Sequence, residues 1–321
     1  MRDATVCTSK GAFVQGDAAQ VKRFLQNNAE PVWLDLLDPT PDDIEILQND
    51  FGFHPLAIED ATRRPQRPKV DSYGRYYFVV FYCVGLNEQT GRIETSPLYM
   101  FVASNYLVTV HHDPIAPIPE TVRRWHEPNS PLGDDIGALI YALLDAIVDD
   151  YFPVMDQVAE LIEDLEDAIF ERFDDGALQT IFQLKKDLLN MRRVVGPERD
   201  VLNVMLRRDI PVFAPEDVAY LQDVYDHIVR VSDNLDTYRD LLSSVLDSYL
   251  SMQSNRLNQI LKVLTVASIV LMSSSLVAGI YGMNFEYMPE LHWRFGYAWA
   301  LSLMIGIAGG LIVLFRRMKW L

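Results

Sequence analysis

Cysteines, basic residues and glycine-rich motifs are scarce in this sequence, and each shortage excludes a class of protein. The two cysteines, Cys7 and Cys83, cannot form a disulfide framework and favour a reducing compartment. The 28 Lys and Arg residues are outnumbered by 45 Asp and Glu. The net charge of −17 therefore argues against a nucleic-acid-binding protein, which needs a basic face for phosphate. Because phosphate-binding loops, nucleophile elbows and paired-cysteine zinc motifs are also missing, we expect no catalysis and no use of ATP.

Charge is unevenly distributed along the 321 residues. Residues 262–321 contain only two acids, Glu286 and Glu290, and five bases: Lys262, Arg294, Arg316, Arg317 and Lys319. The bases exceed the acids by three there, so the first 261 residues carry a net charge of −20. With 49% hydrophobic residues the chain is not disordered. We therefore expect an acidic folded region followed by a region that is almost free of charge.

Two long uncharged runs close the sequence, residues 263–285 and 295–315. A helix of about 20 apolar residues crosses the hydrocarbon layer of a membrane, so each run is long enough to span it. The alternative is a pair of buried helices in a soluble protein. Two such runs in succession favour membrane spans, as do aromatic residues at their ends, namely Tyr281, Trp293, Tyr297, Trp299 and Trp320.

The basic residues predict how these spans are oriented. The short tail Arg316-Arg317-Met318-Lys319 should stay in the cytoplasm, and two spans then bring the first 261 residues to the same side. No hydrophobic signal segment opens the chain between Met1 and Gln20. We expect a multi-pass protein of the cell inner membrane with both termini in the cytoplasm. Two helices cannot enclose a pore, so conduction would require several subunits.

A single long helix is expected to lead into the first span. No proline occurs between Pro215 and Pro289, and the only glycines there are Gly279 and Gly282. A continuous helix over 216–281 would be on the order of 100 Å long. It would begin with acidic residues next to the positive end of its dipole. An ordinary coiled-coil stalk is the alternative, but this rod continues directly into a span and would transmit movement to it.

One face of this helix mixes polar and apolar residues on its way through the membrane. Spacings of three and four relate Asn255, Asn258, Leu261, Leu264 or Thr265, Ser268, Met272, Ser275 and Gly279. Ser and Thr often only hydrogen-bond their own helix in membranes, which is the competing interpretation. The second span contains only Ser302 and several glycines, so the first span is the better candidate for lining a pore.

The turn between the spans reads Gly282-Met283-Asn284, and Glu286 and Glu290 follow it. A glycine that ends a helix needs no functional explanation. The turn lies, however, at the outer mouth of the expected pore. The Asn carbonyl can hydrogen-bond the waters around a cation without removing them, which suits Mg²⁺ because Mg²⁺ dehydrates reluctantly. Conduction also needs binding weak enough for release, so we expect the two glutamates to attract cations without forming the filter.

These features resemble the CorA family of magnesium and cobalt transporters. The resemblance rests on Gly282-Met283-Asn284 in this position, on the following Met288-Pro289-Glu290-Leu291 and on the basic tail. Glu59-Asp60 and Arg67-Pro68-Lys69-Val70 extend it over nearly the whole chain. It implies a homopentamer with a cytoplasmic α/β funnel and uptake of Mg²⁺, with Co²⁺ and Ni²⁺ as further candidate ions. Because no motif for ATP use is present, this transport should be passive and driven by the membrane potential. The resemblance also implies a filter at Gly282, Met283 and Asn284 and a conduction path lined by Asn258, Leu264, Met272 and Ser275. Ser275 departs from the threonine that the family often has there.

The acidic first part of the chain is expected to be α/β and then helical. Residues 31–37, 75–84 and 96–111 have the composition of strands, with a turn from Asn87 to Gly91, and Thr40-Pro41 should begin a short helix. From Leu132 the pattern is helical, with breaks expected at Pro153, Gly176, Gly196-Pro197 and Pro211. The expected ranges are an α/β domain 1–130, a helical segment 131–215, a stalk and first span 216–281 with its membrane part at 262–281, a loop 282–295, a second span 296–315 and a tail 316–321.

The many acids of this region are in part a solvated helix surface. The resemblance implies that some form regulatory Mg²⁺ sites between subunits, at Asp60 and Asp223 and, in a looser set, at Glu59 and Asp145. Internal Mg²⁺ bound there would hold the pore closed. His111-His112-Asp113 also suggests a metal site, but it ends a strand, so we favour a structural role. Two other functions stay open: a zinc transporter of the ZntB type, disfavoured by Met283, and a non-conducting, membrane-anchored oligomeric sensor.

Overall fold

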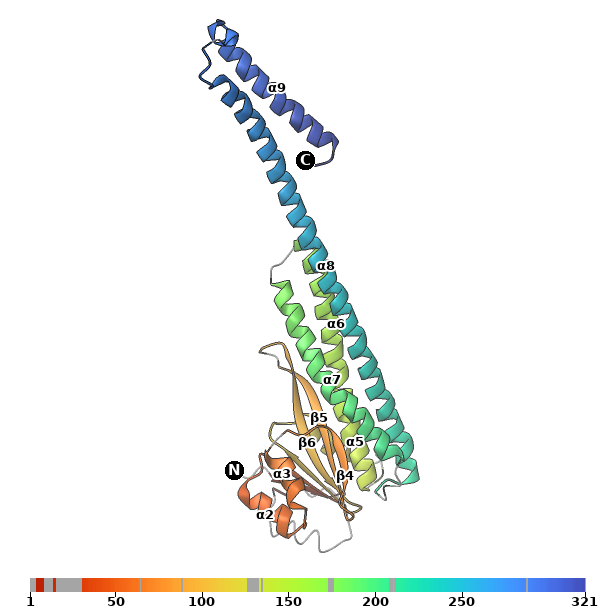
Figure 1. Ribbon diagram of the computed structural model, residues 1–321. Helices are drawn as coiled ribbons and strands as arrows, with labels where there is room; N and C mark the ends of the chain where they lie inside the picture. The colour runs from red at the N-terminus through yellow and green to blue at the C-terminus, as the bar shows by residue number, and fades with distance from the viewer. Residues whose placement is uncertain are drawn as a thin grey trace. The chain divides into compact units, whose positions relative to one another are not determined.

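The computed structural model describes residues 4–8, 14–15, 31–63, 65–87, 89–125, 133, 135–172, 176–207, 210, 212–286 and 288–320 (Figure 1). The chain divides into two compact units, 1–244 and 245–321. The boundary between them falls inside one helix, α8 (Pro215–Tyr281), so the finer domain ranges expected from sequence remain predictions.

A seven-stranded mixed sheet forms the base of the first unit. Its strands are β1 (Ala4–Thr8), β2 (Val14–Gln15), β3 (Val32–Leu37), β4 (Lys69–Ser72), β5 (Tyr77–Asn87), β6 (Arg92–Val102) and β7 (Tyr106–His111). The order across the sheet is β2-β1-β3-β7-β6-β5-β4. Strands β3 and β7 pair in parallel and all the other neighbours are antiparallel. The expected strand-rich runs and the turn at Asn87–Gly91 are therefore confirmed.

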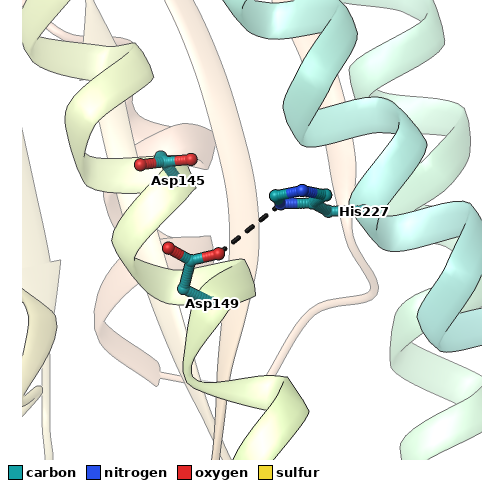
Figure 2. Close-up of side chains that lie close together, drawn as sticks. All are labelled: Asp145, Asp149 and His227. Atoms are coloured by element: carbon teal, nitrogen blue, oxygen red, sulfur yellow. Dashed lines mark ion pairs between the residues drawn. The ribbon is translucent and has the colours of Figure 1, made fainter.

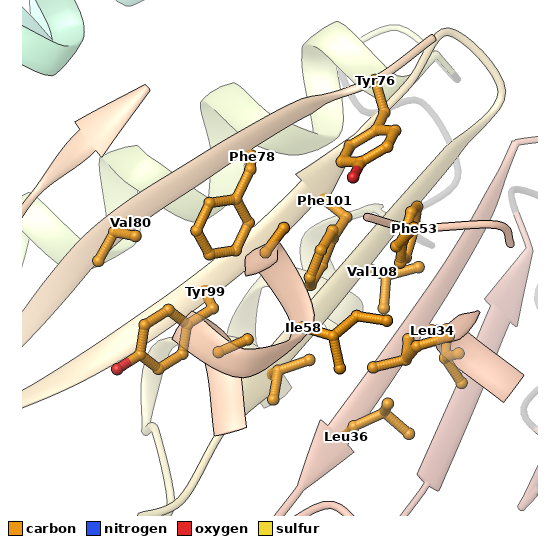
Figure 3. Packing of buried hydrophobic residues seen from close by; sticks show 14 of the residues in the cluster. Leu34, Leu36, Phe53, Ile58, Tyr76, Phe78, Val80, Tyr99, Phe101 and Val108 are labelled. Atoms are coloured by element: carbon orange, nitrogen blue, oxygen red, sulfur yellow. The ribbon is translucent and has the colours of Figure 1, made fainter. Parts of the chain in front are cut away.

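One face of the sheet is covered by two short helices, α2 (Pro41–Asn49) and α3 (Pro55–Arg63). Alternate residues of the strands point to this side and join the helices in one apolar core, where Phe53 stacks on Phe101 with ring centroids 4.2 Å apart (Figure 3). Full burial of each such side chain contributes roughly 1.5–3 kcal/mol. Helix α2 begins at Thr40 with a capping box to Asp43 and with Pro41 at its first position, as the sequence predicts.

The other helices of this unit are α4 (Pro117–Trp125), α5 (Ile136–Asp149), α6 (Tyr151–Asp167) and α7 (Ala177–Arg207), with a π-helical turn η1 (Ala168–Arg172) after α6. Helices α5 and α6 contact the sheet through β5. Helix α5 is the most deeply buried of these helices, because eleven of its fourteen residues are buried.

The break expected at Gly196-Pro197 is wrong, because α7 continues through both residues. The helix is held on each side of Pro197 by buried apolar side chains, among them Val194, Val195 and Val201, and this packing outweighs the one hydrogen bond that a proline removes. The break expected at Pro153 falls instead at Asp150, where α5 ends and α6 begins. Helix α7 starts directly after Gly176, as expected, and Pro211 lies outside the described residues.

Helix α8 has 67 residues and is followed by a short 3-10 turn, η2 (Pro289–His292), and by α9 (Gly296–Arg317). This confirms the single long helix. Helices α8 and α9 each contain a stretch long and apolar enough to cross a membrane, and little of either stretch is buried within the chain. Large apolar side chains are exposed along both, including Leu264, Leu271, Met272 and Leu276 on α8 and Tyr297 and Ile305 on α9.

Candidate functional site

The Gly282-Met283-Asn284 turn begins directly after the last residue of α8, Tyr281. The Gly282 N–H donates to the Ala278 carbonyl at 2.9 Å, which continues the helical bonding by one residue. A Cβ at position 282 would lie 3.2 Å from that carbonyl oxygen, closer than most real Cβ contacts, so any other residue there would require a small shift of this carbonyl. Met283 and Asn284 are exposed in the chain, so the Asn284 amide can reach a ligand from solvent.

The loop after this turn is tied to the start of α9. The Gly296 N–H donates to the Trp293 carbonyl at 3.0 Å, and the Trp293 N–H donates to the Glu290 carbonyl at 3.3 Å. A Cβ at Gly296 would collide with the Glu290 carbonyl, so glycine permits this close approach. Glu286 and Glu290 have exposed side chains, as cation-attracting residues require.

The four side chains expected to line the conduction path, Asn258, Leu264, Met272 and Ser275, all lie on α8 and are exposed. At 3.6 residues per turn they fall within an arc of about 120° around the helix. Exposure of Leu264 and Met272 at 60% and 71% leaves two large apolar groups uncovered on the same stretch as Asn258. In the second unit, a hollow of about 560 Å³ adjoins Asn258, Lys262 and Trp320.

A group of three potential metal ligands lies in the first unit, formed by Asp145 and Asp149 of α5 and His227 of α8 (Figure 2). One ligand atom from each residue lies within 4.8 Å of the others. The two aspartates are four residues apart on one helix, so they share a face, and Asp149 Oδ1 lies 3.5 Å from His227 Nδ1. The side chain of His227 is 28% exposed and that of Asp149 is 48% exposed, so the group is open to an ion from solvent.

The charges around this group favour a bound cation. Burial and the nearby charge of Asp149 raise the pKa of Asp145 above its usual value, while Arg124, whose Nη1 is 3.3 Å from Asp145 Oδ2, opposes this rise. Two carboxylates that repel each other gain most from a shared positive charge. Asp223 extends the group, since its Oδ2 lies 3.9 Å from His227 Nε2 one turn away on α8.

Asp60 and Glu59 lie on α3 and have other partners within the chain. Asp60 Oδ2 lies 2.9 Å from Lys69 Nζ, which also contacts Asp71 at 2.7 Å, and Glu59 pairs with Arg63 at 3.6 Å. Among the described residues, no hydrogen bond or ion pair joins Asp60 to Asp223. Of the four predicted ligands, Asp145 and Asp223 therefore both lie near His227. Asp60 and Glu59 lie on α3, where they pair with Lys69 and Arg63.

Sequence reasoning missed Asp149 and His227. Asp149 belongs to an acidic stretch in which no single residue stands out, and His227 lies 78 residues further along. The available signal was the repeated spacing of four residues, Asp145 to Asp149 and Asp223 to His227, which places each pair on one helix face.

The metal interpretation of His111-His112-Asp113 is not supported, because both ring nitrogens of His111 already have partners. Nε2 lies 3.1 Å from Asp35 Oδ1, and Nδ1 lies 2.7 Å from the Asp113 carbonyl oxygen. Thr109 Oγ1 also donates to Asp35, and the indole N–H of Trp33 donates to Thr109. His111 is thus part of a buried polar network that ties β3 to β7.

An α/β domain, a long helix that ends in an apolar stretch, and a second apolar helix after an Asn-containing turn define a class of membrane transport proteins. The family model for CorA-like Mg²⁺ transporter proteins matches residues 28–317. The cobalt/magnesium transport protein CorA of Thermotoga maritima is 35% identical over 312 residues, which cover 96% of this chain and 88% of that protein. The chain belongs to the CorA-like Mg²⁺ transporter family, whose members are transporters and not enzymes.

Solved structures agree with this fold. The complete structure of the CorA magnesium transporter from Methanocaldococcus jannaschii superposes with a TM-score of 0.84 at 24% identity, covering 99% of this chain and 98% of that one. The cytoplasmic domain of ZntB from Vibrio parahaemolyticus has a TM-score of 0.61 at 11% identity and covers 70% of this chain and 88% of that one. Both are likenesses of fold alone.

Proposed function

We propose that this protein takes up Mg²⁺, and also Co²⁺ or Ni²⁺, passively through a pore driven by the membrane potential. The observation that carries the proposal is the exposed Asn284 amide, held by the Gly282 turn between two apolar helices in a chain of the CorA-like family. The relative from Thermotoga maritima is named a cobalt/magnesium transport protein. A neutral amide can hold hydrated Mg²⁺ weakly enough to release it.

The pore is proposed to form in a homopentamer in the cell inner membrane, with both termini in the cytoplasm. Two apolar helices per chain cannot enclose a pore, so several copies are needed. The exposed Leu264 and Met272 on α8 support a path along this helix, because an uncovered apolar surface in the first span requires another helix, lipid or a narrow pore beside it. Asn258 and Ser275 would supply the polar contacts of the same path.

Uptake is proposed to be limited by metal bound at Asp145, Asp149 and His227, with Asp223 beside them. These side chains offer suitable ligand atoms for the transported ions. The carboxylate oxygens suit Mg²⁺, which keeps part of its water shell, and the imidazole nitrogen suits Co²⁺ and Ni²⁺. Bound metal would relieve the repulsion between the aspartates. Asp60 and Glu59 of a neighbouring subunit are proposed to complete the set, since within one chain they lie elsewhere.

The test is ion flux into liposomes that contain the purified protein, with a negative-inside potential and separate Mg²⁺, Co²⁺, Ni²⁺ and Zn²⁺ arms. The proposal expects Mg²⁺ influx that increases with the potential. Flux of Zn²⁺ without Mg²⁺ would indicate a zinc transporter of the ZntB type. Absence of flux for every ion, with the protein shown to be inserted and oligomeric, would indicate a non-conducting sensor.

A further inference from the structure

The buried carboxyl group of Glu198 has no role in the transport proposal. Glu198 lies on α7 directly after Pro197, and its side chain is completely inaccessible to solvent. A carboxylate without a cation is costly in such a place, since burial penalises the charged form. Among the described residues, no Lys, Arg or His forms an ion pair or hydrogen bond with it.

Glu198 contacts two other elements of the first unit. The backbone N–H of Tyr82, on β5, donates to Glu198 Oε1 at 2.8 Å. The hydroxyl oxygen of Tyr151, the first residue of α6, lies 3.1 Å from both carboxyl oxygens and 2.7 Å from the Tyr82 carbonyl oxygen. Three elements, α7, β5 and α6, therefore meet at this carboxyl group.

The number of protons decides how this network is satisfied. Tyr151 has one hydroxyl proton, and its shorter contact is with the Tyr82 carbonyl, which can only accept. If the hydroxyl donates there, its contact with Glu198 needs a proton from the glutamic acid. A neutral Glu198 thus completes a closed ring: Tyr82 N–H to Glu198, Glu198 O–H to Tyr151, and Tyr151 O–H to the Tyr82 carbonyl. An ionised Glu198 would compete with that carbonyl for the only hydroxyl proton.

The titratable groups facing Glu198 offer it no positive charge. They are Tyr82 and Cys83 on β5 and Tyr151 on α6, with Asp150 at the junction of α5 and α6. Asp150 adds to the negative potential felt by Cys83 and Tyr151. None of these groups supplies a cation that would hold the carboxyl group at position 198 in its charged form, and burial, which favours the neutral form, outweighs the hydrogen bonds from the Tyr82 N–H and the Tyr151 hydroxyl.

We propose that Glu198 is a neutral carboxylic acid whose proton closes a latch between α7, β5 and α6, and that loss of this proton opens the latch. The latch lies at a weak point of α7, because Pro197 has already removed one backbone hydrogen bond there. It also fixes Tyr151, which begins α6 at the junction with α5. Opening would loosen α7 and the start of α6 against the sheet as the surroundings become alkaline, whichever ion the protein transports.

The direction of the pH effect follows from the position of the carboxyl group. Burial raises the pKa of Glu198 to about 8, and the Tyr82 N–H and the Tyr151 hydroxyl lower it by less. The native state therefore keeps a proton that the unfolded chain releases at about pH 4.3. Stability should fall as the pH rises between these two values and level off above the upper one, where both states are ionised. In the native state the latch itself opens near the raised pKa of Glu198, about 8.

The experiment measures the full-length protein in detergent by infrared difference spectroscopy between pH 6 and pH 9, together with amide hydrogen exchange. Wild type should show a protonated carboxyl band that disappears near pH 8 and is absent in Glu198→Gln. Exchange in 79–84 and 194–202 should increase at high pH relative to Glu198→Gln, whose amide keeps both contacts without titrating. If the Gln variant does not fold, Glu198→Leu serves instead, and the protonated carboxyl band should be absent from its spectrum.

Glu216→Gln is the matched control, because Glu216 is exposed at the start of α8, and this variant should behave as wild type. A Glu198 carboxylate already ionised at pH 6 would overturn the proposal. An identical pH response of exchange in wild type and Glu198→Gln would overturn it as well.

Discussion

His227 adds a nitrogen ligand to a group that otherwise offers carboxylate oxygens. Its ring lies edge-on to Phe152, with centroids 5.5 Å apart, and this packing helps to hold the imidazole beside Asp149. Imidazole binds Co²⁺ and Ni²⁺ well and Mg²⁺ poorly, whereas carboxylates bind all three. At the scale of single residues, we therefore expect His227 to set which ions the proposed site prefers.

Replacing His227 by Gln should weaken Co²⁺ binding to the protein more than Mg²⁺ binding. Loss of a residue that only hydrogen-bonds a metal ligand typically lowers metal affinity roughly 10–100-fold. Loss of the nitrogen ligand itself should lower the affinity for Co²⁺ by at least as much. Mg²⁺ affinity should change severalfold at most, because the aspartates remain. Calorimetric titration of each ion measures both effects.

The matched control is His112→Gln, since His112 is exposed and lies 3.4 Å from Asp38, outside the group. It should bind both ions as wild type does. Equal losses of Co²⁺ and Mg²⁺ affinity in His227→Gln would contradict a ligand role and indicate a packing defect.

The His111–Asp35 pair between β3 and β7 should make the stability of the first unit depend on pH. Burial lowers the pKa of His111, but the hydrogen bond to Asp35 and the charges of Asp35 and Asp113 raise it more, so the net pKa is raised. A histidine with a raised pKa contributes its full stabilisation below about pH 6.5 and loses it as the pH rises through the folded-state pKa.

Asp35→Asn should therefore destabilise the protein by about 1.5–3 kcal/mol at pH 6 and by less at pH 8, since it removes the partner of a charged imidazole. Thermal unfolding in detergent at the two pH values measures this difference. If the destabilisation were the same at both, the imidazole would not be charged in the folded state.

Helix α8 is the element that carries residues of both units. Its 67 residues include His227 and Asp223 at one end and Asn258, Leu264 and Met272 at the other. A continuous hydrogen-bonded rod transmits a rotation or tilt along its length, and a break would interrupt it. Ser244, the last residue of the first unit, is exposed, and its hydroxyl donates to the Asp240 carbonyl within the helix.

Ser244→Pro should break α8 at this point at a cost of about 3 kcal/mol in local helix stability. We expect ion flux in this variant to lose its inhibition by Mg²⁺ on the cytoplasmic side, because metal binding near His227 no longer acts on the span. Flux into liposomes at low and high Mg²⁺ measures the response. Ser244→Ala keeps the helix and should keep the inhibition; inhibition of normal strength in Ser244→Pro would contradict transmission through α8.

The elements differ in how far the sequence predicts them. The strands are predicted well from their local composition, and α8 is predicted well from the long run of residues without proline. The continuation of α7 through Gly196-Pro197 is not, because it depends on Val194, Val195 and Val201 finding buried partners from other elements. Motif and resemblance propose Asn284 and Asp223 as candidates from the sequence, whereas His227 becomes a candidate only once the fold places α5 beside α8.

At the scale of the whole molecule, acidic charge is concentrated in the first 261 residues, at −20 per chain. Five copies would carry −100 there. Bound dications would relieve the electrostatic repulsion between these acidic regions. Asp60 and Asp223 are proposed to share an ion across neighbouring subunits. Within one chain the Lys69 ammonium group lies 2.9 Å from the Asp60 carboxylate and partly neutralises it. An ion bound at Asp60 must therefore compete with Lys69.

The double variant Asp60→Ala with Asp223→Ala should continue to transport at high cytoplasmic Mg²⁺, with inhibition weakened about tenfold or more in Mg²⁺ concentration. Removing two ligands leaves the closed assembly without its stabilising ion. The control is Asp42→Ala with Asp226→Ala, which removes one exposed acid from α2 and one from α8. Unchanged inhibition in the Asp60 and Asp223 variant would reject the assignment of these residues.

The central claim, that ions pass the Asn284 turn, is tested most directly by Mg²⁺ flux into liposomes for Asn284→Ala beside Asn49→Ala. Asn49 is an exposed asparagine at the end of α2, so the control makes the same change outside the turn. We predict that Asn49→Ala transports as wild type, while Asn284→Ala loses most of its Mg²⁺ flux with its oligomeric state unchanged. Wild-type Mg²⁺ flux in Asn284→Ala would contradict the account.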